Sequence, residues 1–204
     1  MKSLLLPPTP RLPGRPRRFD MDSALDQAIV VFSERGYSGA SIADLGKAMG
    51  LTAGSLYKAF ADKQAIFVAA FERYAALRLE KLDQALATAP TGRERLRQVF
   101  AQYVASSSGA EGRRGCLIVH SATELSTAEP AAQRVAQALA ANETRLLTLL
   151  QQGQADGSIR LDLDAAAVAR LLLCVLQGMR VVGKTGRTQP EMAALVGQVM
   201  RLLN

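Results

Sequence analysis

The sequence predicts an all-α protein, and three observations support this fold class. Aromatic residues make up only 5% of the 204 residues and Trp is absent, whereas the helix formers Ala and Leu are abundant. Apolar residues recur at helical spacing, and no β-hairpin pattern occurs. Glycines and prolines separate the periodic segments. We therefore expect a small three-helix domain over residues 19–63 and a larger helical domain over residues 64–204.

Composition and charge narrow the classes of protein. Apolar residues make up 49% of the chain, as in globular proteins, which excludes a disordered chain. The net charge of +7 and the pI of about 9.8 favour an anionic partner, either nucleic acid or a membrane surface. Residues 1–18 contain four arginines among prolines: Arg11, Arg15, Arg17 and Arg18. Because proline resists helix formation, we expect residues 1–18 to be a flexible basic arm.

The first two expected helices follow this arm. Asp20 or Asp22 can begin a helix that reaches about Arg35, with apolar residues on one face and Gly36 as its stop. Ser41 then caps a short second helix. Asp44 stands three residues later, where a capping box has its acidic residue, and Gly50 ends the helix.

A third helix, capped by Thr52 and reaching about Phe60, completes a helix-turn-helix pattern. Its first turn is small and uncharged: Thr52, Ala53, Gly54 and Ser55. An acidic residue there would repel phosphate, so this turn suits entry into a DNA groove. Tyr57 and Lys58 follow as a hydroxyl and a cation that can reach phosphate. The alternatives are a helical hairpin without a DNA role, Tyr57 as a packing residue, and Lys58 and Lys63 as ordinary solvated charges.

The segment from Gly36-Tyr37 through Ser41-Ile42-Ala43-Asp44-Leu45 to Leu56-Tyr57-Lys58-Ala59-Phe60-Ala61-Asp62-Lys63 resembles the DNA-binding domain of the TetR family of bacterial repressors. Arg114-Gly115-Cys116-Leu117 also resembles one branch of that family.

The resemblance implies an all-helical homodimer that binds double-stranded operator DNA. It implies that Ser41 caps the second helix beside phosphate and that residues 52–55 open the recognition helix. It further implies that Tyr57 and Lys58 contact DNA and that Lys63 meets phosphate. Family members often carry His where this chain has Ala59. The arm, through Arg15, Arg17 and Arg18, either binds the minor groove or stays solvated; alternatively, translation starts near Met21.

Six further helices are expected after residue 60, near 62–87, 93–107, 114–127, 130–152, 164–184 and 189–203. The most apolar stretch, 165–182, is interrupted by Arg170, Gln177 and Arg180, so we interpret it as a buried helix rather than a membrane span. The helices at 164–184 and 189–203 are apolar on more than one face. This favours a dimer interface in which each subunit contributes these two helices. Two cysteines are too few for a disulfide scaffold, so a cytoplasmic location is the simpler interpretation.

Cys116, His120 and Glu124 are spaced to share one helical face, with Thr123 beside them. The sequence leaves four interpretations of these residues open: buried core residues, a redox sensor, metal ligands, or polar residues that line a ligand pocket. Two helical turns separate the outer residues, which argues against one metal ion bound by all three. We expect no metal and no cofactor. An enzyme is disfavoured because no Gly-rich phosphate loop or usual metal-ligand spacing is present.

The expected mechanism is release of DNA when a small apolar or amphipathic effector enters the C-terminal domain. The residues expected to line its cavity are Phe71, Tyr74, Phe100, Tyr103, Cys116, His120 and Thr123. The effector would shift the fourth helix and thereby change the spacing of the two recognition helices.

Overall fold

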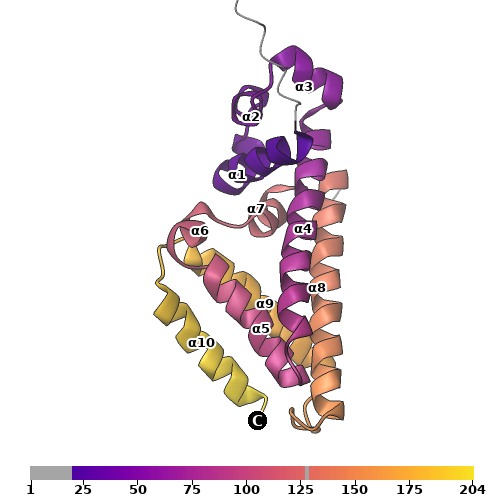
Figure 1. Cartoon of the computed structure of the whole chain (residues 1–204), viewed down its shortest axis with the longest axis vertical. Helices are drawn as coiled ribbons and strands as arrows, with labels where there is room; N and C mark the ends of the chain where they lie inside the picture. Colours follow the sequence, from indigo (N-terminus) through magenta and orange to yellow (C-terminus); the bar gives the residue numbers. More distant parts are fainter. Residues whose placement is uncertain (1–19, 127–128) are drawn as a thin grey trace, which may run out of the picture.

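The computed structural model describes residues 20–126 and 129–204, and every regular element within them is a helix. The all-α prediction is therefore confirmed. The first three helices form one end of an elongated molecule, and the remaining helices form its body (Figure 1). The helices of the small end are α1 (Met21–Gly39), α2 (Ile42–Met49) and α3 (Ala53–Ala59). The helices of the body are α4 (Lys63–Ala87), α5 (Gly92–Ser106), α6 (Gly109–Arg114), α7 (Leu117–Glu124), α8 (Pro130–Ala155), α9 (Ala165–Gly183) and α10 (Gln189–Leu202).

The caps predicted for the small end are confirmed. The Ser41 hydroxyl accepts from the Asp44 amide while the Asp44 carboxylate accepts from the Ser41 amide, which is a reciprocal capping box. Gly50 ends α2 in the left-handed conformation, with φ of 69°, which a residue without a side chain adopts at little cost. Gly36 interrupts α1 with φ of 74°, and one more turn reaches Gly39.

The fourth helix joins the small end to the body. Phe67 of α4 packs edge-on against Phe32 and Tyr37, with ring centroids 5.2 and 5.3 Å away. Arg73 of α4 forms a bidentate pair with Asp26 of α1, at 2.7 and 2.8 Å. The lower part of α4 runs beside α8 (Figure 1). One helix therefore contributes both to the packing of α1 and to the body.

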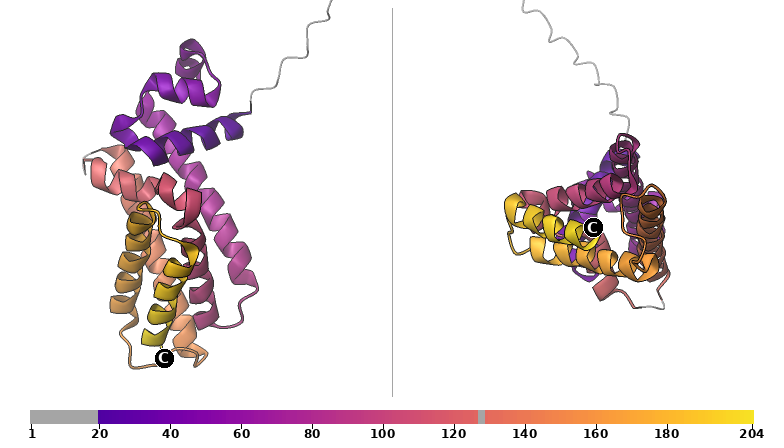
Figure 2. Two further views of the ribbon diagram at one scale, coloured as in Figure 1. Left: turned by 90° about the vertical axis from the view of Figure 1, so that its left-hand side faces the viewer. Right: turned by 90° about the horizontal axis from the view of Figure 1, so that it is seen from below.

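A second core fills the body between α5, α8, α9 and α10 (Figure 2). Its largest fully buried side chains include Phe100, Leu150 and Leu172. Gly92 and Gly153 bring α5 and α8 into close contact, since a Cβ on Gly92 would lie 2.2 Å from the Gly153 nitrogen. The body is thus a tightly packed helical bundle with its own core.

The single helix predicted over 114–127 is wrong. The structure has two helices there, α6 and α7, separated by Gly115 and Cys116. Gly115 has φ of 96°, outside the helical range, and Cys116 is extended at the start of α7. Gly109 and Gly112 look like helix breakers in the sequence, yet α6 contains both, because tertiary contacts outweigh their low helix propensity.

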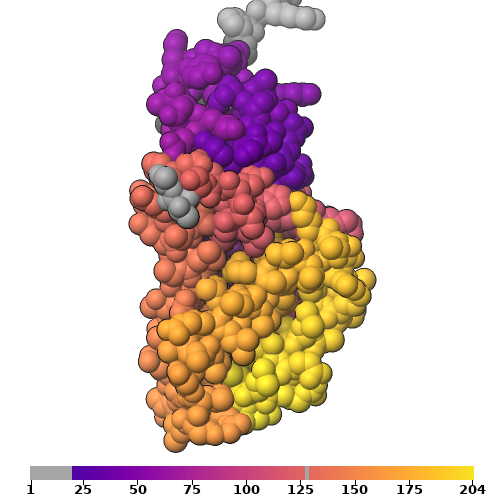
Figure 3. Space-filling view, turned by 180° about the vertical axis from the view of Figure 1, so that it is seen from behind, coloured from indigo at the N-terminus to yellow at the C-terminus, as the bar shows by residue number. Residues whose placement is uncertain are grey.

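The apolar helix α9 buries only one of its faces. It is long and apolar enough to cross a membrane by length and composition, with a mean hydropathy of 1.7, as core helices of other proteins also are. Only 28% of that window is buried. α9 and α10 form one face of the body (Figure 3). These two helices carry several exposed large apolar side chains: Leu171, Val181, Val182, Leu195 and Leu202. The prediction of a buried helix is thus met on one face alone.

Candidate DNA interface and effector site

The N-terminal turn of α3 points away from the rest of the chain. Thr52 caps the helix by accepting from the Ser55 amide, and its hydroxyl lies 3.0 Å from the Ser55 hydroxyl. The side chains predicted to contact DNA from this helix are all exposed: Thr52, Ala53, Gly54, Ser55, Tyr57 and Lys58. Tyr57 is 58% exposed, so burial of its ring does not explain its presence. Only Leu56 of α3 is buried, and it anchors the helix to the core.

Gly54 is not required by the packing of the chain itself. A Cβ added at this position would meet no atom within 4 Å. A helical glycine lowers stability by about 0.5–1 kcal/mol relative to alanine, and packing within the described residues does not account for that cost. A contact of the α3 backbone with DNA at Gly54 stays a prediction.

The structure places the remaining predicted DNA-contacting residues in two different settings. Ser41 is exposed at the start of α2, as predicted. The Lys63 ammonium instead turns toward the α1–α2 junction, where it donates to the carbonyls of Tyr37 and Ala40, at 3.0 and 3.2 Å. It therefore fixes that junction to α4, and its contact with phosphate stays a prediction. Arg15, Arg17 and Arg18 lie outside the described residues.

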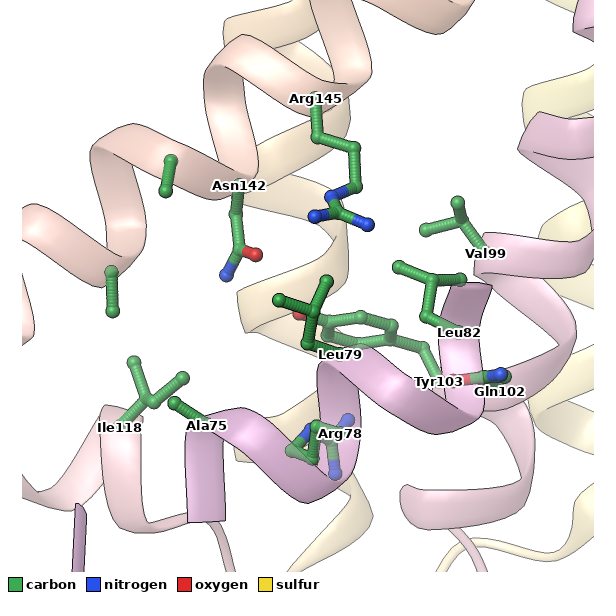
Figure 4. Close-up of a pocket in the computed structure, with 12 residues that line it drawn as sticks. Ala75, Arg78, Leu79, Leu82, Val99, Gln102, Tyr103, Ile118, Asn142 and Arg145 are labelled. Carbon is green, nitrogen blue, oxygen red and sulfur yellow. The ribbon is translucent and has the colours of Figure 1, made fainter. Parts of the chain in front are cut away.

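Two hollows in the body are lined by some of the residues predicted to bind the effector. The first, which we call the α8 hollow, measures about 150 Å³ and lies between α4, α5, α7 and α8. Asn142 and Arg145 extend into it from α8 toward Leu79 and Tyr103 (Figure 4). The second, the α6 hollow, measures about 180 Å³ and includes Tyr74 and Glu111. Tyr103 and Tyr74 thus each line one hollow, as predicted for a ligand site.

The other predicted effector residues do not line either hollow. Phe71 and Phe100 are 3% and 0% exposed and belong to the two separate cores. Cys116 is also buried, His120 is partly exposed, and Thr123 is exposed with its hydroxyl bonded to its own helix. Large aromatic side chains are ambiguous in a sequence, because core residues and pocket walls use the same types.

Cys116, His120 and Glu124 do not form one cluster, so their predicted common helical face is wrong. Cys116 precedes α7, since the helix begins only at Leu117. His120 Nε2 lies 2.5 Å from the Lys184 ammonium of the α9 terminus, and Glu124 contacts the small end of the molecule. Within residues 20–126 and 129–204, no group of three His, Cys, Asp or Glu side chains could hold a metal ion.

Cys116 lies among polar groups instead of beside the imidazole. Its Sγ is 3.6 Å from the Tyr74 hydroxyl. Burial alone raises the pKa of the Cys116 thiol, but the positive charge of Arg180 and a backbone hydrogen bond from Val119 outweigh it, so the pKa lies below its usual value. Burial raises the pKa of Tyr74, and its hydroxyl remains protonated.

Glu124 links the two halves of the molecule. Its Oε2 accepts from the backbone amides of Tyr37 and Ser38, at 2.6 and 3.3 Å. These amides follow Gly36, where a Cβ would lie 2.1 Å from Glu124 Oε1, so the carboxylate fits only against glycine. The last residue of α7 is therefore bonded directly to the junction that leads into α2.

Comparison with known families agrees with this arrangement. Residues 24–70 match the family described as bacterial regulatory proteins, tetR family. Residues 92–196, about half of the chain, match the tetracyclin repressor-like C-terminal domain. The chain belongs to the TetR family. It is a DNA-binding transcriptional repressor of the helix-turn-helix type.

Individual TetR relatives match between 78% and 94% of the chain. The transcriptional repressor ComR of Escherichia coli is 31% identical over 93% of this chain and 91% of its own length. The regulator YezE of Bacillus subtilis is 30% identical over 78% of this chain and 83% of its own. A cysteine variant of the TetR regulator CifR, solved with a 26-base-pair operator DNA, superposes with a TM-score of 0.78 at 33% identity, covering 94% of this chain and 100% of that one.

Three residues were not predicted from the sequence to have a special role: Arg78 and Arg180, which are cations in the body, and Glu124, which bonds the body to the small end. Arg180 did leave a signal, because a charged residue inside the apolar run 165–182 is unusual unless it has a partner or a function. Arg78 left none, since arginine on a long helix is ordinarily a solvated charge. Glu124 depends on a contact 87 residues away in the sequence, which no local pattern reveals.

Proposed function

We propose that this TetR-family repressor acts in the cytoplasm as a homodimer that binds a palindromic operator and releases it when a small effector enters the body. The observation that carries the proposal is the exposed, uncharged first turn of α3, with Tyr57 and Lys58 beyond it. Helix-turn-helix dimers read half-sites about one DNA turn, roughly 34 Å, apart, so a two-fold symmetric protein favours a palindrome. CifR, the structural relative, was solved on operator DNA.

The dimer is supported by the face that α9 and α10 leave exposed. Its stripe on α9 runs through Leu171, Cys174, Gly178, Val181 and Val182, at helical spacing along one side of the helix. Such an apolar stripe on an isolated monomer would face water, whereas a second copy would cover it. Two helices from each copy would then form a four-helix interface.

Operator binding is tested by gel shift over a range of salt concentrations. Binding should weaken steeply as salt rises, because each phosphate contact releases counterions. Lys58→Ala should weaken binding and reduce the salt slope by about two charges per dimer, one from each subunit. Lys81→Ala is the matched control, because it removes the same charge from the distant part of α4. A flat salt response, or equal affinity for Lys58→Ala and the wild type, would contradict this assignment of the DNA interface.

A second candidate for the signal is oxidation or alkylation of Cys116. The observations that favour it are the 3.6 Å contact between the thiol and the Tyr74 hydroxyl and the positive charge of Arg180, which against the effect of burial lowers the pKa of Cys116 and favours the reactive thiolate. Cys116→Ser should then abolish release of DNA by a thiol oxidant, while Cys174→Ser, which changes the exposed cysteine, should leave release intact. Release of DNA by oxidant from the Cys116→Ser protein would exclude this candidate.

A further inference from the structure

The body of the protein contains a buried cation without a carboxylate partner. The Arg180 side chain on α9 is 3% exposed, and its Nη2 donates to the Gly115 carbonyl at 2.8 Å. Its Nε and Nη1 atoms are buried and have no hydrogen-bond partner. None of the ion pairs formed within residues 20–126 and 129–204 involves Arg180. Because an unpaired buried charge is costly, this arrangement requires a nearby anion.

A second, under-used cation lies in the same region. The guanidinium of Arg78 on α4 is 5.4 Å from the ring centroids of both Tyr74 and Tyr103. Its side chain is only 26% exposed, yet its polar contacts are long: 3.4 Å to the Ser106 hydroxyl and 4.0 Å to the largely exposed Glu111. A guanidinium has five N–H donors in a fork that matches a carboxylate, so most of this capacity is unused.

Arg78 lies where a small molecule can reach it. It lines both the α8 hollow and the α6 hollow, and so does Gln102. The α8 hollow has no acidic residue in its lining; its polar groups are Arg78, Gln102, Tyr103, Asn142 and Arg145 (Figure 4). Arg145 is already paired with the Asp83 carboxylate at 2.7 Å, whereas the ion-pair contact of Arg78, with Glu111, is 4.0 Å long. The rest of the wall is largely apolar, with Leu79, Leu82, Val99 and Ile118.

The Cys116 thiol can neutralise at most one of the two cations. Burial raises the pKa of this thiol, and the positive charges of Arg180 and Arg78 both lower it. Two guanidiniums, one thiolate and the Glu111 carboxylate, which lies 4.0 Å from Arg78, sum to no net charge. Glu111 is 53% exposed and its contact with Arg78 is long, so a ligand carboxylate would compete with it for the Arg78 guanidinium.

We propose that the effector of this repressor is a small organic anion whose carboxylate binds Arg78, with Arg180 as the buried second cation and the apolar part of the ligand in the α8 hollow. This inference rests on the proposed ligand-responsive function and adds the chemical class of the ligand. Binding at Arg78 would engage α4 directly, whereas Arg180 on α9 lines neither hollow and would act through its charge alone. Since α4 also packs against α1, the signal has a direct path to the small end of the molecule.

The test compares carboxylates with their uncharged amides, which have nearly the same shape. Benzoate and benzamide, and hexanoate and hexanamide, are added to the full-length protein, with thermal stability and operator affinity as the two readouts. The carboxylates should raise the melting temperature and lower operator affinity, whereas the amides should do neither. Arg78→Gln should weaken carboxylate binding about tenfold or more, since it removes a charge-assisted bidentate contact. Arg170→Gln, which removes an exposed arginine from α9, should bind as the wild type does.

Each outcome decides the matter. Equal effects of acid and amide, unchanged binding by Arg78→Gln, or the same response to inorganic phosphate would overturn the proposal. Absence of any response to both carboxylates would also overturn it, provided the protein without additive binds its operator. Failure to bind operator without additive would instead refute the proposed function. Arg78→Lys, which keeps the charge without the fork, should retain part of the affinity and so separates charge from a general packing effect.

Discussion

The contact between Glu124 and the α1–α2 junction gives a quantitative prediction. Glu124→Gln keeps the size of the side chain and leaves one oxygen that can still accept from Tyr37 and Ser38. A hydrogen bond to a charged group contributes about 1.5–3 kcal/mol and a neutral one about 0.5–1.5 kcal/mol. Because the site is exposed, water moderates the difference, and we expect a loss of about 1–2 kcal/mol in the free energy of unfolding.

The assay for this change is hydrogen exchange at the two amides, together with chemical denaturation. A local loss of about 1 kcal/mol should speed exchange at Tyr37 and Ser38 roughly fivefold, while amides in the body core remain protected. Glu143→Gln is the control, because that carboxylate pairs with the exposed Arg170 and should contribute under about 0.5 kcal/mol. Unchanged protection of the Tyr37 and Ser38 amides would refute the idea that Glu124 holds the junction.

Three further predictions concern other parts of the molecule. Gly54→Ala should raise the free energy of unfolding by about 0.5–1 kcal/mol yet weaken operator binding in a gel shift; intact binding would mean that no close approach occurs there. Gly178→Leu, at a position where an added Cβ would meet no atom of its own chain within 4 Å, should shift the protein from dimer to monomer in light scattering, and a persistent dimer would place the interface elsewhere. Burial and the Lys184 ammonium lower the pKa of His120 from 6.5, so the unfolded chain binds that proton more readily. Stability should therefore be complete above about pH 6.5 and fall as the pH drops through the lowered value, with a flatter profile for His120→Gln in denaturation experiments; an identical profile would exclude this role.

The small end of the molecule was predictable because its structure depends on local chemistry. Ser41, Gly50 and Thr52 each perform in the structure the capping role that their neighbours in the sequence indicate. Caps and left-handed turns involve residues within four positions of each other, so a sequence displays them directly. The first turn of α3 was likewise recognisable, because its lack of acidic residues is itself a local property.

The body was less predictable because its decisive contacts are distant in sequence. The break at Gly115 occurs where the chain packs against the carbonyl of Ser33, while Gly112 stays helical although it is an equally strong breaker. The sequence spacing predicted that Cys116 lies beside the His120 imidazole. Its neighbours in the structure are Tyr74 and Arg180, which come from other helices. Spacing along one helix indicates which residues share a face, and it carries no information on what that face meets.

Because α4 packs into the small end, it limits where this repressor can be truncated or fused to another protein. The core around Phe32 includes Phe67, Ala70 and Phe71 of α4 and Leu117 of α7, all of which lie beyond residue 63. A fragment ending at residue 63 would expose that core and lack the Phe67 ring. A chimaera that joins the small end to the effector-binding domain of another protein must therefore include the first turns of α4. That domain must also provide an apolar side chain equivalent to Leu117, so the small end and the body cannot be exchanged independently.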